Sequence, residues 1–255
     1  MSSLETTGQK IARSLVAHGV DTLFGIPGAH MYDFNDAVYE ERAALRFIHT
    51  RHEQGAGYMA YGYAKSTGRT GAYTVVPGPG LLNSSAALCT AYAGNAPVFC
   101  ITGNIMSHLI GRGRGQLHEL PDQLATLRGL TRAAERIDHP AAASAVMADL
   151  SSRMMSGRPG PVAVEAPWDV FGQKSLVEAP LLGTPRPAPV ADPDAIANAA
   201  RMIAEAKAPL IMVGGGAVGA GKTGGVFMSQ LLPFVDTKTI EAFYAFEGAY
   251  YGNAA

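Results

Sequence analysis

The chain has 255 residues with a net charge of −1, and 47% of its residues are hydrophobic while only 16% are charged. This composition excludes an intrinsically disordered chain and leaves no basic field to attract nucleic acid or an anionic membrane. No apolar run reaches the ~18 residues of a membrane-spanning helix, and the polar N-terminus lacks the apolar segment of a signal peptide, so we expect a cytoplasmic protein.

Helical patterns alternate with short apolar runs along the first 170 residues. The first helix is expected to begin near Thr6, which has capping-box spacing with Gln9, and to end at Gly19. Another helix is expected over 54–66. The apolar runs occupy 22–24, 45–49, 72–76, 97–102 and 162–165. This alternation predicts an α/β domain over 1–170, with a parallel sheet and helices on both faces.

Residues suited to ligand binding follow several of the predicted strands. Gly28, Glu53 and the run 78–80 all come directly after strand ends. In open parallel sheets, ligands bind beyond the carboxyl ends of the strands. We therefore expect a site at this edge. The plain alternatives are a first-turn carboxylate favoured by the helix dipole at position 53, and ordinary turn chemistry for the glycines.

The pattern changes after residue 170. A proline-rich stretch at 171–191 predicts a stiff, extended linker. A new unit is expected to begin at 192, with a helix over 195–206 and a strand over 209–213. A domain normally needs about 50 residues or more with its own core, so 192–255 is interpreted as the truncated start of a central domain, incomplete as an α/β unit. Its tail is unusually rich in aromatic residues. The two cysteines, Cys89 and Cys100, are predicted to be buried free thiols.

Five sequence blocks carry a family resemblance. They are Phe24–Gly28, Arg51–Ala56, Gly62–Ala64 with Gly68, Gly78–Gly80 with Asn83, and Gly157–Val162. In this order they resemble the N-terminal, pyrimidine-binding domain of thiamine-diphosphate enzymes such as acetolactate synthase and glyoxylate carboligase. The resemblance covers about residues 5–170 and continues weakly to 216.

The resemblance implies a site and a reaction. Glu53 would hydrogen-bond N1′ of the aminopyrimidine and promote the imino tautomer, which removes the proton from C2 of the thiazolium. The pyrimidine ring would be lined by Ile26, Pro27, Gly28, Gly78, Pro79 and Asn83. The implied activity is lyase or transferase chemistry on a 2-keto acid such as pyruvate or glyoxylate, through decarboxylation and carboligation.

A glycine-rich basic loop spans 111–119. The plain interpretation is a solvated surface loop, and its two arginines are too few for nucleic-acid binding. The resemblance implies that this region faces the substrate, with Gln116, His118 and Glu119 as substrate-side groups. The acetolactate branch carries Phe-Gln-Glu here, whereas this chain carries Gln-Leu-His-Glu, so it departs from that branch.

The segment Gly216–Thr223 matches the phosphate-loop pattern GxxxxGK[ST] in full. A P-loop nucleotide-binding protein is therefore an alternative hypothesis. Few residues remain after the motif to complete a nucleotide fold. Some members of the resembled family bind FAD in their central domain, which favours a structural or flavin-side loop instead. His49 and His52 lack the HExxH spacing of a zinc site, so no metal ligand is predicted in this chain.

The resembled family holds Mg²⁺ and the diphosphate in a different domain, through a Gly-Asp-Gly motif that this sequence lacks. Its active sites lie between subunits of a homo-oligomer, a dimer or tetramer. Three hypotheses follow: a truncated family enzyme, a subunit of a split enzyme that needs a partner chain with the diphosphate-binding domain, or a non-catalytic remnant. We favour the first and expect little activity from the isolated chain.

Overall fold

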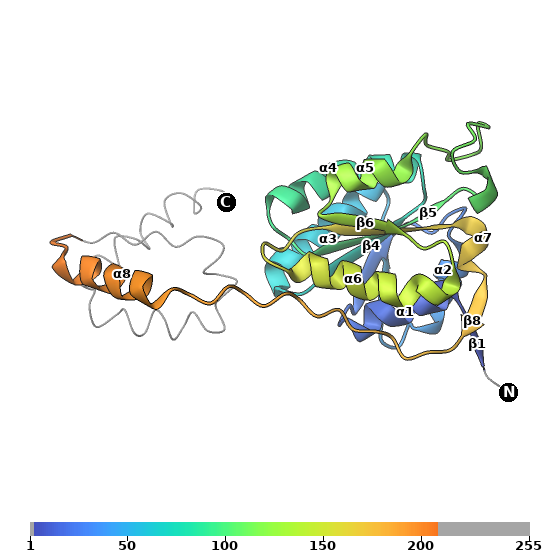
Figure 1. The fold of residues 1–255 in the computed structure, drawn as a ribbon. Helices are drawn as coiled ribbons and strands as arrows, with labels where there is room; N and C mark the ends of the chain where they lie inside the picture. The colour runs from blue at the N-terminus through green and yellow to red at the C-terminus, as the bar shows by residue number, and fades with distance from the viewer. Residues whose placement is uncertain (1–2, 209–255) are drawn as a thin grey trace. The chain divides into compact units, whose positions relative to one another are not determined.

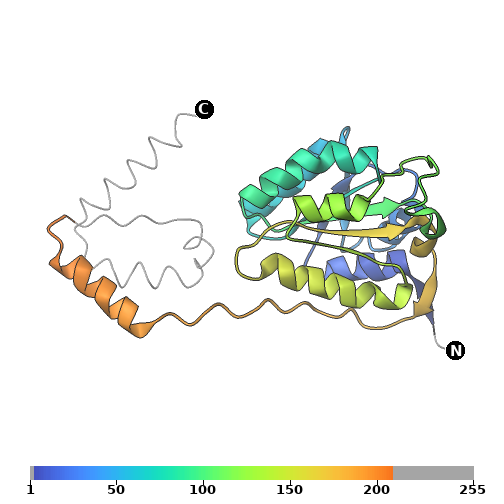
Figure 2. The same cartoon turned by 45° about the horizontal axis from the view of Figure 1, so that its top comes forward.

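The computed structural model describes residues 3–208 of the chain. By its internal contacts the chain divides into two units, Met1–Ala188 and Pro189–Ala255. The first unit contains a six-stranded sheet with helices on both faces, as Figure 1 and Figure 2 show. The predicted α/β class is confirmed.

All six strands are parallel and lie in the order β3-β2-β4-β5-β7-β6. Their bounds are β2 Thr22–Gly25, β3 Arg46–His49, β4 Gly71–Val75, β5 Val98–Asn104, β6 Ala133–Arg136 and β7 Val162–Pro167. The long helices are α1 Thr7–Ala17, α2 Tyr32–Glu40, α3 Glu53–Thr67, α4 Pro79–Ala93, α5 Gln123–Leu130 and α6 Ala143–Met155. Short helical turns occupy η1 Ser107–Leu109, η2 Pro140–Ala142 and α7 Trp168–Phe171. The chain leaves β2 toward β3 and then returns to place β4 on the other side of β2, so the strand order reverses between β2 and β4.

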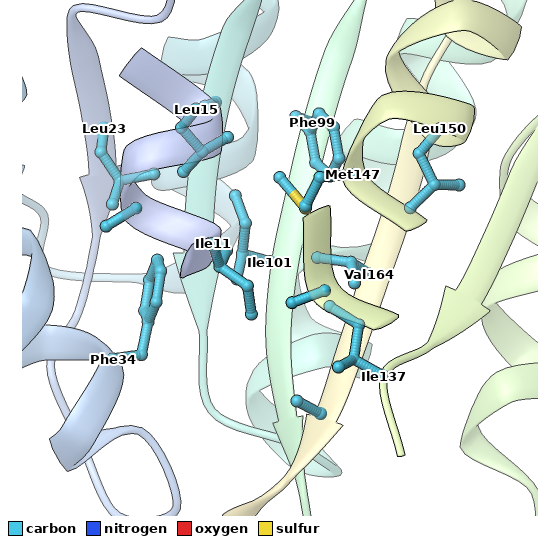
Figure 3. Close-up of a cluster of buried hydrophobic side chains, with 14 of the residues drawn as sticks. Ile11, Leu15, Leu23, Phe34, Phe99, Ile101, Ile137, Met147, Leu150 and Val164 are labelled. Atoms are coloured by element: carbon cyan, nitrogen blue, oxygen red, sulfur yellow. The ribbon is translucent and has the colours of Figure 1, made fainter. Parts of the chain in front are cut away.

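Helices cover both faces of the sheet, and alternate side chains along a strand pack into different cores. On β5, Phe99 and Ile101 join a core with α1, α2 and α6, whereas Val98 and Cys100 join a core with α3, α4 and α5. Figure 3 shows the first of these cores, with side chains of α1 and α6 directed toward the sheet. A strand whose two faces are both covered must be apolar throughout. This requirement explains the continuous apolar runs in the sequence.

Local signals set several helix ends. The side chain of Thr6 accepts a hydrogen bond from Gln9 N at 3.1 Å, and Gln9 Oε1 accepts one from Thr6 N at 2.7 Å, which confirms the predicted capping box. Gly19 follows α1 with φ +79°, as the predicted left-handed stop requires. The predicted helix over 54–66 is α3, which starts one residue earlier and ends one residue later.

The helices α3 and α4 lie side by side on one face of the sheet (Figure 1). A Cβ placed on Gly57 would lie 2.6 Å from Cβ of Ala87, so only glycine permits this spacing. The hydroxyl groups of Tyr58 and Thr90 share a hydrogen bond of 3.1 Å between the same helices. These contacts fix the position of α3, which carries Glu53, relative to α4, which carries Asn83.

The two cysteines differ in burial. Cys100 is fully buried on β5, and desolvation by burial raises the pKa of its thiol to about 12. Cys89 is exposed, so the prediction of a buried thiol there is wrong. The reason is helical periodicity, because position 89 lies on the outward side of α4 next to the buried Leu88.

Part of the predicted linker is bound to the first unit. A short strand β8 (Lys174–Leu176) pairs antiparallel with β1 (Leu4–Thr6). Further along, Leu181 N donates to Ser144 Oγ at 2.7 Å, and Gly183 N donates to His18 Nε2 at 2.9 Å. The unit boundary after Ala188 falls within 171–191, but the three-part division of the chain stays a prediction.

In the second unit the structure describes α8 (Pro193–Glu205), which begins after the N-cap Asp192 and corresponds to the helix expected over 195–206. The predicted strand at 209–213, the phosphate-loop pattern at 216–223 and the aromatic tail lie outside the described residues. None of the helices within residues 3–208 is both long and apolar enough to cross a membrane.

Candidate functional site

Three segments meet at the carboxyl edge of the sheet, where the strand order reverses between β2 and β4. Val76, directly after β4, lies between two glycines: a Cβ on Gly28 or on Gly80 would come within 2.5 Å of one of its methyl groups. Gly28 follows β2 and Gly80 lies in the first turn of α4. Open α/β sheets bind ligands at such reversal points, because the loops diverge there and leave a crevice.

Glu53 is the first residue of α3, reached from β3 by a short turn. Thr50 N donates to Gly25 O at 2.9 Å, which ties this turn to the end of β2. The N-cap is His52, whose Nδ1 accepts from Gln54 N at 3.1 Å. A carboxylate in the first helical turn is stabilised by the helix dipole, typically by about 0.3–1 kcal/mol. The plain alternative for position 53, a first-turn carboxylate stabilised by the helix dipole, therefore describes where Glu53 lies. The same placement directs its carboxylate toward α4.

The two oxygens of Glu53 have different surroundings. Asn83 Nδ2 donates to Oε2 at 3.1 Å across the gap between α4 and α3. Within residues 3–208, Oε1 forms no hydrogen bond, and a Cβ placed on Gly80 would lie 3.7 Å from it. The residue is half-buried. The arrangement offers one oriented acceptor oxygen close to Gly80.

The turn before α4 is held by a buried glutamine that the sequence analysis missed. Gly78 has φ +60°, and its N–H donates to Gln123 Oε1 at 2.9 Å. Gln123 Nε2 donates to Gly103 O and to Glu165 Oε2, both at 2.7 Å. One amide side chain therefore ties together the ends of β4, β5 and β7.

The network ends in an ion pair whose carboxylate is buried. Glu165 on β7 is fully buried, and Arg136 Nε on β6 donates to its Oε1 at 2.6 Å. A buried carboxylate is tolerated when its oxygens are paired and hydrogen-bonded, and here both are. The sequence signal for this residue was a charged side chain at the end of a strand buried on both faces. It was not interpreted as part of the site.

The loop at 111–119 reaches the same edge only at its end. Glu119 Oε2 accepts from Gln116 N at 2.8 Å, and Glu119 N donates to Gln116 O at 2.9 Å, which closes a local turn. The Gln116 residue is exposed. His118 lies directly on the Gly78 turn, since a Cβ on Gly78 would come within 2.5 Å of His118 O.

A second histidine, also missed in the sequence, contacts this loop. His30 is 5% exposed and lies 3.2 Å from His118, measured between the two Nδ1 atoms. Desolvation by burial lowers the pKa of His30, and the neighbouring His118 lowers it further. The signal available in the sequence was a histidine two residues after Gly28, in the segment that follows β2.

The predicted site residues thus fall into groups. Gly28, Glu53 and Asn83 meet around Val76 and Gly80, while Gly78 and His118 form a neighbouring contact. The segment with Ile26 and Pro27 follows β2 at the same edge, and Pro79 begins α4. The site roles of all these residues, with those of Gln116 and Glu119, stay predictions. Among residues 3–208 no group of three or more His, Cys, Asp or Glu side chains could hold a metal ion.

Comparison with known proteins gives a consistent result. Residues 5–126 match the family described as thiamine pyrophosphate enzyme, N-terminal TPP binding domain. A probable 2-ketoarginine decarboxylase of Pseudomonas aeruginosa is 36% identical over 218 residues, which are 85% of this chain and 39% of that protein. A probable acetolactate synthase large subunit of Methanocaldococcus jannaschii is 35% identical over 84% of this chain and 36% of its own length. The acetolactate synthase large subunit of Corynebacterium glutamicum is 36% identical over 84% of this chain and 34% of its own length. The chain therefore spans little more than a third of these relatives.

Proposed function

Because this chain belongs to the thiamine pyrophosphate enzymes through its N-terminal TPP binding domain, we propose that Glu53 is the carboxylate that binds the cofactor's aminopyrimidine ring. The observation that carries the proposal is the state of its two oxygens. Asn83 orients the side chain through Oε2, and among the described residues 3–208 nothing donates to Oε1. A ring nitrogen that carries a proton could donate to that oxygen, and the carboxylate would hold the proton at N1′.

The chemistry of Glu53 fits a ring N–H, since Asn83 orients the carboxylate and Oε1 is an acceptor. Val76 fills the space that a Cβ would take on Gly28 and on Gly80, and the buried Gly78 turn keeps α4 in place. With Ile26, Pro27 and Pro79 these residues would line the ring. When bound, thiamine diphosphate supplies a carbon nucleophile that adds to a keto group, and the protein supplies its placement.

The proposed reaction is decarboxylation or carboligation of a 2-keto acid. The relatives carry the names 2-ketoarginine decarboxylase and acetolactate synthase, and both names denote 2-keto acid chemistry. His118 and Glu119 would act on the substrate side, because their loop reaches the Gly78 turn. The replacement of Phe-Gln-Glu by Gln-Leu-His-Glu favours a 2-keto acid other than the pyruvate pair of acetolactate synthesis.

The cofactor's other end needs further protein. The sequence contains no Gly-Asp-Gly motif, and residues 3–208 provide no metal site. We therefore propose that Mg²⁺ and the diphosphate are held by a separate domain, which belongs either to a longer form of this protein, assembled as a cytoplasmic homo-oligomer, or to a partner subunit. On this proposal, residues 3–188 alone bind the cofactor weakly and show little turnover. An FAD site would involve the glycine-rich loop at 216–223, outside the described residues.

A chimera tests the proposal. Residues 1–188 would replace the matched segment of the Corynebacterium acetolactate synthase, and turnover of several 2-keto acids would be measured with added thiamine diphosphate and Mg²⁺. The expected result is keto-acid-dependent release of CO₂ that Glu53→Gln abolishes. Glu41→Gln is the matched control, because Glu41 is also half-buried but lies at the C-terminal end of α2. A Glu53→Gln chimera as active as the control would remove Glu53 from its role.

A further inference from the structure

Two histidine rings from distant parts of the chain share a hydrogen bond. Their Nδ1 atoms lie 3.2 Å apart, and the ring centroids of His30 and His118 are separated by 5.1 Å. Such a bond needs an N–H on one ring and a lone pair on the other. The neutral pair must therefore hold opposite tautomers, one ring protonated at Nδ1 and the other at Nε2.

His30 is the rigid member of the pair. Its ring packs edge-on against Trp168 with centroids 4.7 Å apart, and the side chain is buried. Its backbone lies in the left-handed region at φ +69°. Against this backbone, a Cβ on Gly103 would come within 2.7 Å of His30 O. The ring is held from the ends of β5 and β7, so its direction does not depend on the loop.

His118 is the adaptable member. Residues 111–117 before it are all exposed, and Gly111, Gly113 and Gly115 all have positive φ with open space around them. His118 itself has φ +69°, which is uncommon for a residue with a side chain. The contact between His118 and His30 is therefore the first side-chain contact, after the exposed residues 111–117, that joins this loop to the edge of the sheet. It leaves Nε2 of His118 as the remaining polar atom of that ring.

We propose that His30 is a positioning residue that holds Nδ1 of His118 and so sets the tautomer and direction in which His118 presents Nε2 beside the Gly78 turn. That Nε2 meets a 2-keto acid rests on the proposed function, whereas the coupling of the two rings does not. A histidine with a committed tautomer can act as a defined proton donor or acceptor, as general acid–base chemistry requires.

The surroundings of the two rings limit what else could set their tautomers. His30 is faced by Trp168 from α7 and by Gly103 from β5, neither of which titrates. The carboxylate of Glu119 is bonded to the backbone of Gln116. The carboxylate of Asp169 accepts from N and Oγ of Ser107. Within residues 3–208, neither imidazole is hydrogen-bonded to a carboxylate, and each is hydrogen-bonded to the other ring.

Protonation affects the pair in two steps. The first proton is compatible with the contact, because an imidazolium N–H can donate to the neutral partner. The second proton places two N–H groups opposite each other and must break the contact. Coupled, two-step titration is therefore the signature of the arrangement.

Nitrogen-15 NMR of histidine-labelled full-length chain tests the proposal without cofactor or substrate. Once the signals are assigned from single His→Asn variants, His30 and His118 of the wild type are expected to be locked in opposite tautomers, one Nδ1–H and the other Nε2–H, with coupled titration. His30→Asn keeps a residue that tolerates φ above zero, and it should release His118 to a mixture of tautomers with a single-step titration. His118→Asn should move the pKa of His30 upward. His108→Asn, in the exposed turn η1, is the control that should leave both signals unchanged.

The outcomes separate this proposal from the proposed function. If His118 averages between tautomers in the wild type, or titrates identically with and without His30, the positioning role is overturned. If the two rings titrate as a coupled pair but the chimera turns over no 2-keto acid, the proposed function is contradicted. The positioning role of His30 is then still supported. In an active chimera, His30→Asn should lower kcat and shift the acid limb of its pH profile, with the KM for cofactor unchanged. Equal changes in the His108→Asn chimera would count against the pair.

Discussion

Two parts of the candidate site are built in different ways. Glu53 begins α3 and Asn83 lies in the second turn of α4, two long helices that pack tightly at Gly57, and each helix follows a strand of the sheet. The loop at 111–119 contains no helix or strand and is tied near its end by the contact between His118 and His30. Both parts reach the same edge of the sheet.

The comparison shows how one site can combine a rigid centre, the helices that carry Glu53 and Asn83, with an adaptable rim, the loop at 111–119. Helix ends are positioned by many hydrogen bonds and by core packing, so no single contact decides where Glu53 lies. The loop depends on few contacts, so one substitution can change its geometry while the core stays intact. Functional loops on a rigid scaffold generally divide these tasks in this way.

The largest expected effect concerns the rigid part. In the active chimera, Glu53→Gln should slow exchange of the cofactor's C2 hydrogen by roughly 10²–10⁴-fold, because an amide cannot hold a proton at the ring nitrogen. His118→Asn should reduce turnover but leave this exchange nearly unchanged. Both rates are measured by proton NMR in D₂O. If C2 hydrogen exchange slowed equally in Glu53→Gln and in His118→Asn, the division of the site into a rigid centre and an adaptable rim would be contradicted.

The next effect concerns the buried polar network. Gln123→Ala removes the partner of Gly78 N and one partner of Glu165, and it should lower the free energy of unfolding by about 2–4 kcal/mol. Gln116→Ala, in the exposed loop, should change stability by less than about 0.5 kcal/mol. Urea unfolding of both variants checks the prediction. Similar stabilities would mean that the network does not support the edge.

Glycine substitutions should also separate the two parts. Gly80→Ala would place a methyl group within 2.5 Å of Val76 and is expected to cost about 1–3 kcal/mol by overpacking. Adding Val76→Ala should relieve the contact at Gly80. At Gly111 there is open space, and only the left-handed backbone opposes a side chain, at about 1–2 kcal/mol. Rescue by Val76→Ala is expected for Gly80→Ala and not for Gly111→Ala, as measured by thermal unfolding.

The smallest effect is a pH dependence of stability. Burial and the neighbouring His118 lower the pKa of His30 in the folded chain below the unfolded value of about 6.5. The unfolded state then binds more protons, so stability is complete above about pH 6.5 and falls as the pH decreases toward the folded pKa. Urea unfolding between pH 5 and 8 should show this slope in the wild type and a shallower one in His30→Asn. An unchanged slope in the variant would assign the effect to other groups.

Much of the site could be predicted from the sequence because its residues follow strand ends. Glu53, Gly28 and Asn83 come after strands or on the helices that follow them, and parallel strands bring such positions to one edge. His30, Gln123 and Glu165 could not be found in this way. Their roles depend on contacts between residues 20 to 88 positions apart in the chain. The exposed Cys89 was missed because composition around a residue does not say which side of a helix it occupies.

The sequence by itself determined the α/β class, the capped start of α1 and the position of Glu53 at the beginning of a helix, because these depend on local periodicity, capping and turn residues. The tertiary structure alone decided that Asn83 donates to one oxygen of Glu53 and that Gln123 joins three strand ends. It also decided that His30 is hydrogen-bonded to His118 and so contacts the loop. The physical reason is that hydrogen bonds act over about 3 Å, and only the folded sheet brings these distant segments within that distance.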